Sequence, residues 1–182
     1  LLTTAAPWAP RAGAVVVEKN GWIYLLGGEE GFTCDDPAKP CPPYFNDVWR
    51  SRDGANWELV TPEAGWSPRP GHQCAVLLNT IVCFGGFGLP PSPFGPSANP
   101  MDVWISKDGA LWQLVSDSPW NAASPDDIKY DFDVLVVQGG AGGNRPSIYT
   151  FGGDRETFNF TDPTNYLRVD NDVWRFSPPA GR

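Results

Sequence analysis

Short apolar segments recur along the chain, and the three clearest ones each end in a pair of glycines, at Trp22–Gly28, Thr80–Gly86 and Ile148–Gly153. Further along each time comes Asp-Val-Trp, at residues 47–49, 102–104 and 172–174. Short apolar runs bounded by turn residues predict strands. Recurrence at a long period predicts one supersecondary unit per repeat.

Each unit is expected to contain up to four strands. The first strand is predicted at Ala14–Glu18, Gln73–Leu77 and Phe132–Val137. The second runs into the glycine pair, the third carries Asp-Val-Trp, and the fourth carries Trp-x-Leu-Val in the first two units. Asn20-Gly21, Asp53-Gly54 and Asp108-Gly109 lie between expected strands, and such pairs are typical of two-residue type I′ hairpins.

Two units begin with similar residues, Pro10-Arg11-Ala12-Gly13 and Pro68-Arg69-Pro70-Gly71. Together with the glycine pairs, Asp-Val-Trp and the later tryptophan, this pattern resembles the kelch repeat family. The resemblance implies an all-β fold of four-stranded antiparallel blades, with about three blades forming a partial propeller or part of a larger one. Ser51–Trp57 and Ser106–Trp112 also resemble the Asp-box hairpin of sialidase-type propellers, although they are one residue shorter.

The unit boundaries predict a blade remnant at 1–8, blade one at 9–61, blade two at 67–116 and blade three at 124–182, the last without its fourth strand. Propellers typically need four to eight blades. Two interpretations therefore stay open. The further blades come from the same longer chain, or they come from a second copy that completes a six-bladed ring.

Residues that recur at one blade position are interpreted as scaffold: the tryptophans, the aspartates of Asp-Val-Trp, the glycine pairs, Arg11 and Arg69. The unrepeated connections at 29–46, 87–100 and 154–171 are expected at one end of the blades, where binding sites usually lie. The candidate binding residues there are Phe32, Asp35, Asp36, Tyr44, Phe45, Phe87, Phe94, Asp154, Arg155, Phe158, Phe160 and Tyr166. The alternative is that the aromatic residues only hold the loops in place.

The four cysteines form two local pairs. Cys34 and Cys41 bracket a short stretch of the first long connection. Cys74 and Cys83 are expected to face each other across a hairpin in the register of the Asn20-Gly21 hairpin, which favours a cross-strand disulfide. The alternative is a reduced core pair in place of Val16 and Leu25. Two local pairs favour an oxidising compartment, outside the cell or at its surface, and Asn159 begins one glycosylation sequon.

Composition excludes several function classes. The net charge of −8 argues against a nucleic-acid partner, because such affinity depends on Lys and Arg. No apolar run approaches the ~18 residues of a membrane span. With a single histidine, His72, no metal site or cofactor is predicted. Calcium at Asp35 and Asp36, or at Asp126 and Asp127, is the alternative, but neither pair has the spacing of a calcium loop.

These observations favour a non-catalytic module that binds a protein or glycan partner through the long connections. The alternative is an enzyme. In that case the chain would be a segment of a galactose-oxidase-like oxidase or of a glycosidase, with catalytic residues outside this segment.

Overall fold

The computed structural model describes residues 1–31, 43–88, 99–116, 119–139, 145–156, 163–164 and 167–178. Within these ranges the chain forms three antiparallel sheets and no α-helix, so the predicted all-β class is confirmed. The first sheet has the order β1 (Val15–Lys19), β2 (Trp22–Leu26), β3 (Val48–Ser51), β4 (Trp57–Thr61). The second has the order β5 (Gln73–Leu77), β6 (Thr80–Phe84), β7 (Val103–Ser106), β8 (Gln113–Ser116).

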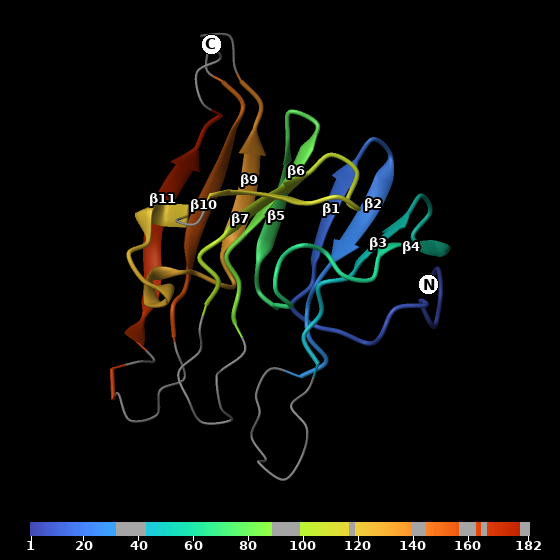
Figure 1. The fold of residues 1–182 in the computed structure, drawn as a ribbon, viewed down its shortest axis with the longest axis horizontal. Helices are drawn as coiled ribbons and strands as arrows, with labels where there is room; N and C mark the ends of the chain where they lie inside the picture. Colours follow the sequence, from blue (N-terminus) through green and yellow to red (C-terminus); the bar gives the residue numbers. More distant parts are fainter. Residues whose placement is uncertain are drawn as a thin grey trace.

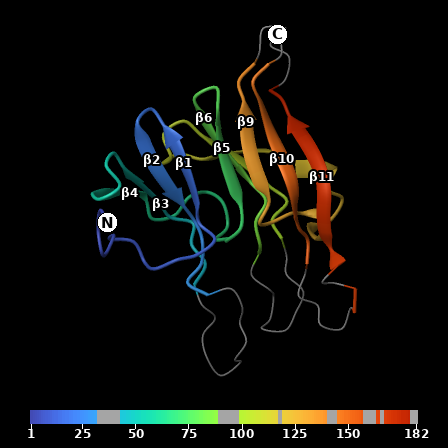
Figure 2. The same cartoon turned by 180° about the vertical axis from the view of Figure 1, so that it is seen from behind.

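The third sheet contains β9 (Asp133–Val137), β10 (Ser147–Asp154) and β11 (Val169–Phe176), in that order. In the part of the chain that the structure describes, no strand pairs with the other edge of β11. The three sheets lie side by side, with the second sheet between the first and the third, as Figures 1 and 2 show from opposite sides. Their first strands meet, because β5 contacts both β1 and β9.

The first and second sheets each begin with a tight hairpin whose register follows from its two-residue turn. Val15 pairs with Leu26 and Lys19 with Trp22, so Asn20-Gly21 forms the predicted two-residue turn, with φ of 55° and 75°. Positive φ at both positions is what a type I′ turn requires. β5 has the predicted bounds, whereas β1 and β9 begin one residue later than predicted.

The turns between the third and fourth strands are longer than predicted. Ser51 pairs with Trp57, which leaves a five-residue loop instead of a two-residue turn at Asp53-Gly54. The Asp53 carboxylate accepts backbone N–H groups two and three residues on, at 2.9 and 2.8 Å, which lowers its pKa. The Trp57 indole donates to the Gly54 carbonyl at 3.0 Å. Asp108 repeats this arrangement in the second sheet, so the side-chain bonds and not the dipeptide fix the loop length.

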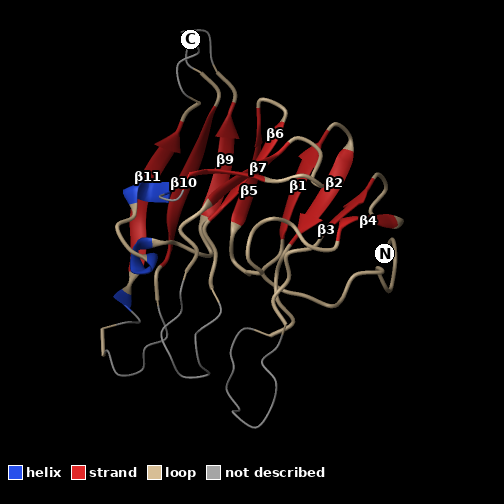
Figure 3. Cartoon of the chain, in the orientation of Figure 1, coloured by secondary structure: helices blue, strands red, loops and turns tan. Residues whose placement is uncertain are grey.

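Two apolar layers hold the three sheets together. The first and second sheets enclose Val15, Val17, Tyr24, Leu26, Val48, Cys74, Ile81 and Cys83. The second and third enclose Ala75, Phe84, Phe132 and Ile148, together with Trp120 of the 3₁₀ helix η1 (Pro119–Asn121). The Trp120 indole donates to the Thr150 hydroxyl of β10 at 3.1 Å. This bond fixes η1 beside the third sheet, where Figure 3 shows it with η2 (Pro125–Asp127).

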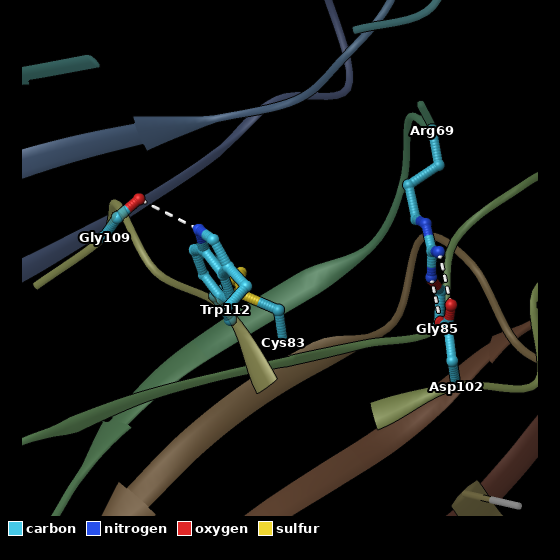
Figure 4. Close-up of a disulfide and its surroundings, with 7 residues drawn as sticks. Arg69, Cys83, Gly85, Asp102, Gly109 and Trp112 are labelled. Atoms are coloured by element: carbon cyan, nitrogen blue, oxygen red, sulfur yellow. Dashed lines mark hydrogen bonds and ion pairs between the residues drawn. A yellow bond between two sulfur atoms is a disulfide. The ribbon is translucent and has the colours of Figure 1, made fainter. Parts of the chain in front are cut away.

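A disulfide joins Cys74 of β5 to Cys83 of β6, with their Cα atoms 4.1 Å apart. The two residues are directly opposed in the hairpin register, so the predicted pairing is confirmed. The bond is buried between the first two sheets and lies beside Trp112 (Figure 4). Cys34 and Cys41 lie outside the described residues.

Replacing Cys74 by valine and Cys83 by leucine is expected to lower the free energy of unfolding by about 2.5 kcal/mol. The reason is the entropy that the bond removes from the unfolded chain by closing a short loop, with a sequence separation of 9. Valine and leucine occupy the equivalent places in the first sheet, so packing is largely kept. Urea unfolding of the oxidised protein and the variant measures the difference. Equal free energies would show that loop closure contributes nothing here.

Candidate functional site

A repeated ion pair marks the end of the sheets from which the long connections leave. Arg11 binds both carboxylate oxygens of Asp47, at 2.6 and 3.1 Å, and donates to the carbonyl of Gly27 at 2.9 Å. Arg69 binds Asp102 in the same way, at 2.5 and 2.9 Å (Figure 4). Recurrence in two sheets identifies these residues as scaffold, in agreement with the interpretation of the sequence.

The third sheet contains an equivalent that the sequence pattern did not reveal. Lys129 is buried, donates to the carbonyl of Gly152 at 3.3 Å and pairs with Asp172. It also lies 3.0 Å from Asp170. Lys129 precedes β9 by the same distance at which Arg11 precedes β1. That offset was the available signal, because the Arg-x-Gly motif is here replaced by Lys-Tyr-Asp.

Backbone hydrogen bonds join the three sheets at this end. The N–H of Gly71 donates to the carbonyl of Gly13 at 3.0 Å, and that of Asp131 donates to the carbonyl of Gly71 at 2.9 Å. Gly71 has a φ of 64°, and a Cβ added there would lie 2.7 Å from a carboxylate oxygen of Asp131. Glycine is therefore needed for this close approach. The result is a rigid base beneath the long connections.

Three aromatic rings pack at this base, one from each repeat. Tyr44, Phe87 and Tyr130 are all buried and form one cluster, with ring centroids 6.5 Å apart for the first two and 5.2 Å for the last two. Tyr44 and Phe87 were candidate binding residues, and their burial favours the alternative that they hold the loops in place. Phe45 also helps to hold its loop in place, because the Arg11 guanidinium lies 4.1 Å from its ring centroid.

Asp154 and Arg155 lie at the end of the third sheet. The backbone of Asp154 makes two hydrogen bonds with Tyr130, both 2.9 Å, and its carboxylate accepts the Glu156 N–H at 2.7 Å. Arg155 donates two bonds of 2.8 Å to Asp170. It lines an open pocket of about 320 Å³ together with Trp120, Asp127, Lys129, Asp170, Asp172 and Trp174. The cations of this pocket are paired with its carboxylates.

Carboxyl groups crowd together near the aromatic cluster. Burial and then the charge of Asp131 raise the pKa of Glu29. Burial and then the charge of Asp154 raise the pKa of both Asp131 and Glu156. The end of the sheets that carries the long connections is therefore locally acidic.

The remaining candidates cannot be placed in this way. Phe32, Asp35, Asp36, Phe94, Phe158, Asn159, Phe160 and Tyr166 lie outside the described residues. Asp126 and Asp127, the alternative calcium ligands, lie 3.7 Å from Arg168 and 3.9 Å from Arg155. Within the described ranges no group of three His, Cys, Asp or Glu side chains could hold a metal ion. Those ranges also contain no helix long and apolar enough to span a membrane.

Comparison of the chain with protein-family models found no match, and comparison with curated proteins found none either. The function is therefore inferred from the residues and geometry of the chain itself.

Proposed function

We propose that the three sheets are blades of a kelch-type β-propeller, and that the chain is a non-catalytic binding module for a protein or glycan. Three features support the blade assignment. The strands of each sheet follow one another in chain order, and the first strands of the sheets are in contact. In every sheet a buried cation pairs with the aspartate of Asp-Val-Trp, at or just before the third strand. Neighbouring sheets of a propeller pack face to face around an axis in this way.

The binding proposal rests on a contrast between two sets of residues. The repeated residues hold the sheets together, whereas the unrepeated residues lie in the long connections. The repeated cations, aspartates and glycines are engaged in bonds that hold the sheets together. The ends of β2, β6 and β10, from which the three long connections leave, all lie at one end of the sheets (Figure 1). Long connections gathered on a rigid base are where binding residues are usually found.

The acidic groups at this end define the chemistry of the partner. Carboxylates accept hydrogen bonds from hydroxyl groups and pair with lysine or arginine. Burial and then the charge of Asp154 raise the pKa values of Asp131 and Glu156, and hydrogen bonds from a glycan hydroxyl cluster or the charge of a basic protein segment would stabilise their carboxylates. The disulfide is consistent with an oxidising compartment, so we place this binding outside the cell.

The test is a binding screen of the oxidised chain against a glycan array and a panel of basic peptides. A variant with Asp131→Asn and Glu156→Gln is expected to bind at least about tenfold more weakly, which corresponds to the loss of about 1.4 kcal/mol. Burial and then the charge of Asp154 raise the pKa of both carboxyls, so folding disfavours their charged forms relative to the unfolded chain, and neutral substitutes are not expected to lower stability.

A matched control removes two carboxyls from the opposite end of the first sheet, through Glu18→Gln and Glu58→Gln. Both residues are exposed. This control is expected to bind as the wild type does. Equal losses in the two variants, or no binding to either library, would contradict the proposal.

A further inference from the structure

The third sheet exposes apolar positions that the other two sheets bury. Leu135 occupies the place of Val17 in the first sheet, and it is 54% exposed where Val17 is 8% exposed. Val173 follows the same aspartate as Val48, and it is 60% exposed where Val48 is fully buried. We call this surface the outer face of the third sheet. Strand register and alternation assign to it the exposed apolar residues Leu135, Val137, Phe151, Val169 and Val173, together with Asp133, Tyr149, Asn171 and Arg175.

The first sheet exposes the complementary kind of surface. Val16 occupies the place of Cys74 in the second sheet, and it is 55% exposed where Cys74 is 5% exposed. The residues in register across this outer face of the first sheet are Val16, Leu25, Trp49 and Leu59. Val16 and Leu59 are exposed, whereas Leu25 is already buried within the chain.

The packing inside the molecule shows how these two kinds of face fit together. The Val17 and Val48 face of the first sheet packs on the Cys74 and Cys83 face of the second. The Ala75 and Phe84 face of the second packs in turn on the third sheet. The outer face of the third sheet is equivalent to the Val17 face, and the outer face of the first is equivalent to the Cys74 face. The chain therefore carries both halves of the interface that it uses internally.

We infer that a second copy of this chain docks here, with the outer face of the third sheet of each copy on the outer face of the first sheet of the other. This inference rests on the proposed propeller arrangement, and it yields a closed ring of two copies. Exposed contiguous apolar surface of this kind marks interaction sites. The contact is heterologous, because two different faces of the chain meet.

The backbone bonds between the sheets form two head-to-tail series. In one, the N–H of a later repeat donates to the carbonyl of the preceding one, from Gly71 to Gly13 and from Asp131 to Gly71. In the other, the N–H of an earlier repeat donates to the carbonyl of the next one, from Gly28 to Arg69 and from Gly86 to Lys129. Within the described part of the chain, the N–H of Gly13 and the carbonyl of Asp131 make no hydrogen bond. A second copy placed in the same relation would continue the first series at both ends.

The first readout is the mass of the oxidised chain in solution at micromolar concentration, by sedimentation equilibrium or light scattering. We expect twice the chain mass of 19.8 kDa. Val173→Asp is expected to give the single-chain mass, because a carboxylate is costly to bury in an apolar contact. Since Val173 is exposed in the free chain, this substitution leaves the fold intact. Leu111→Asp, at a residue of the β7–β8 loop that is also exposed, is the matched control and is expected to keep the doubled mass.

The second readout separates a head-to-tail contact from a symmetric one. Val16→Asp alters the opposite face and is expected to give single chains as well. Mixing the Val16→Asp and Val173→Asp variants leaves one of the two contacts wild type in both partners. Association is therefore expected to return in the mixture, although neither variant associates by itself.

Three results would overturn the inference: a wild type of single-chain mass, species larger than a dimer, or a mixture that stays dissociated. These results are distinct from failure of the binding proposal. Ring formation is measured by mass, whereas the Asp131→Asn and Glu156→Gln variant is scored on ligand binding and is expected to keep the doubled mass.

Discussion

Replacing Arg69 by alanine is expected to lower the free energy of unfolding by about 3–5 kcal/mol, the range for breaking a buried ion pair from one side. Arg69 is almost fully buried, and all five of its N–H groups are used. They bind Asp102, the carbonyl of Gly85, and the carbonyl and hydroxyl of Ser67. Alanine leaves the carboxylate of Asp102 largely buried and without its partner. Urea unfolding at pH 7 measures the loss.

Because the alanine variant could fall below the folding threshold, Arg69→Lys provides a graded comparison. Lysine can reach a glycine carbonyl and an aspartate together, as Lys129 does in the third sheet, but it cannot also satisfy Ser67. We expect it to lose less than the alanine variant. Arg50→Ala is the control, since Arg50 pairs with Glu58 at the surface and such pairs contribute at most about 1 kcal/mol. Equal effects at Arg69 and Arg50 would contradict this account.

Acid is expected to destabilise the protein through His72, with a slope approaching 1.4 kcal/mol per pH unit below the pKa of the unfolded histidine. Burial, and then the charge of Arg69, lower the pKa of His72 to about 3 in the folded protein. Within the described residues its ring nitrogens have no hydrogen-bond partner, and the Trp66 ring lies 5.3 Å away. Between pH 6.5 and about 3 the unfolded chain therefore binds a proton that the folded chain excludes, so stability falls as the pH falls.

His72 is the only histidine of the chain, so its titration can be assigned without ambiguity. The Cε1 proton resonance in an NMR titration reports its pKa in the folded state directly. The unfolding free energy is then measured from pH 7 to 5 for the wild type and for His72→Gln. We expect the variant to lack the wild-type slope. A folded-state pKa near 6.5, or parallel profiles, would show that the imidazole is not held neutral by burial.

The parts of the fold that depend on local periodicity could be predicted from the sequence. The Asn20-Gly21 turn fixes the register of one hairpin, and the repeat transfers that register to Cys74 and Cys83. Because a two-residue turn fixes which residues oppose each other in a hairpin, the sequence also predicted the disulfide between Cys74 and Cys83. The sequence also distinguished the repeated scaffold residues from the unrepeated ones, because recurrence is visible in the sequence itself.

Properties that depend on three-dimensional surroundings could not be predicted. The loops at Asp53 and Asp108 are longer than their dipeptides indicate, because the aspartate side chains bind the backbone beyond the glycine. Tyr44 and Phe87 stand in unrepeated connections, yet they are buried against Tyr130 by contacts between distant repeats. Lys129 pairs with the aspartate of Asp-Val-Trp as an arginine does in the other two sheets, although it stands in a different motif. Burial leaves no local mark in the sequence, and the change from arginine to lysine leaves only the offset of Lys129 from the next strand.

The unpaired edge of β11 has a consequence for the chain before it meets any partner. A long strand with an open edge is a template on which other strands can add, and natural proteins often block such edges with inward-pointing charges. Asp170 and Asp172 alternate along β11 and turn toward Lys129, so a strand that joined this edge would lie against charged groups. The carboxylates that anchor the third sheet are thus also expected to disfavour the addition of a foreign strand at this edge before a partner is bound.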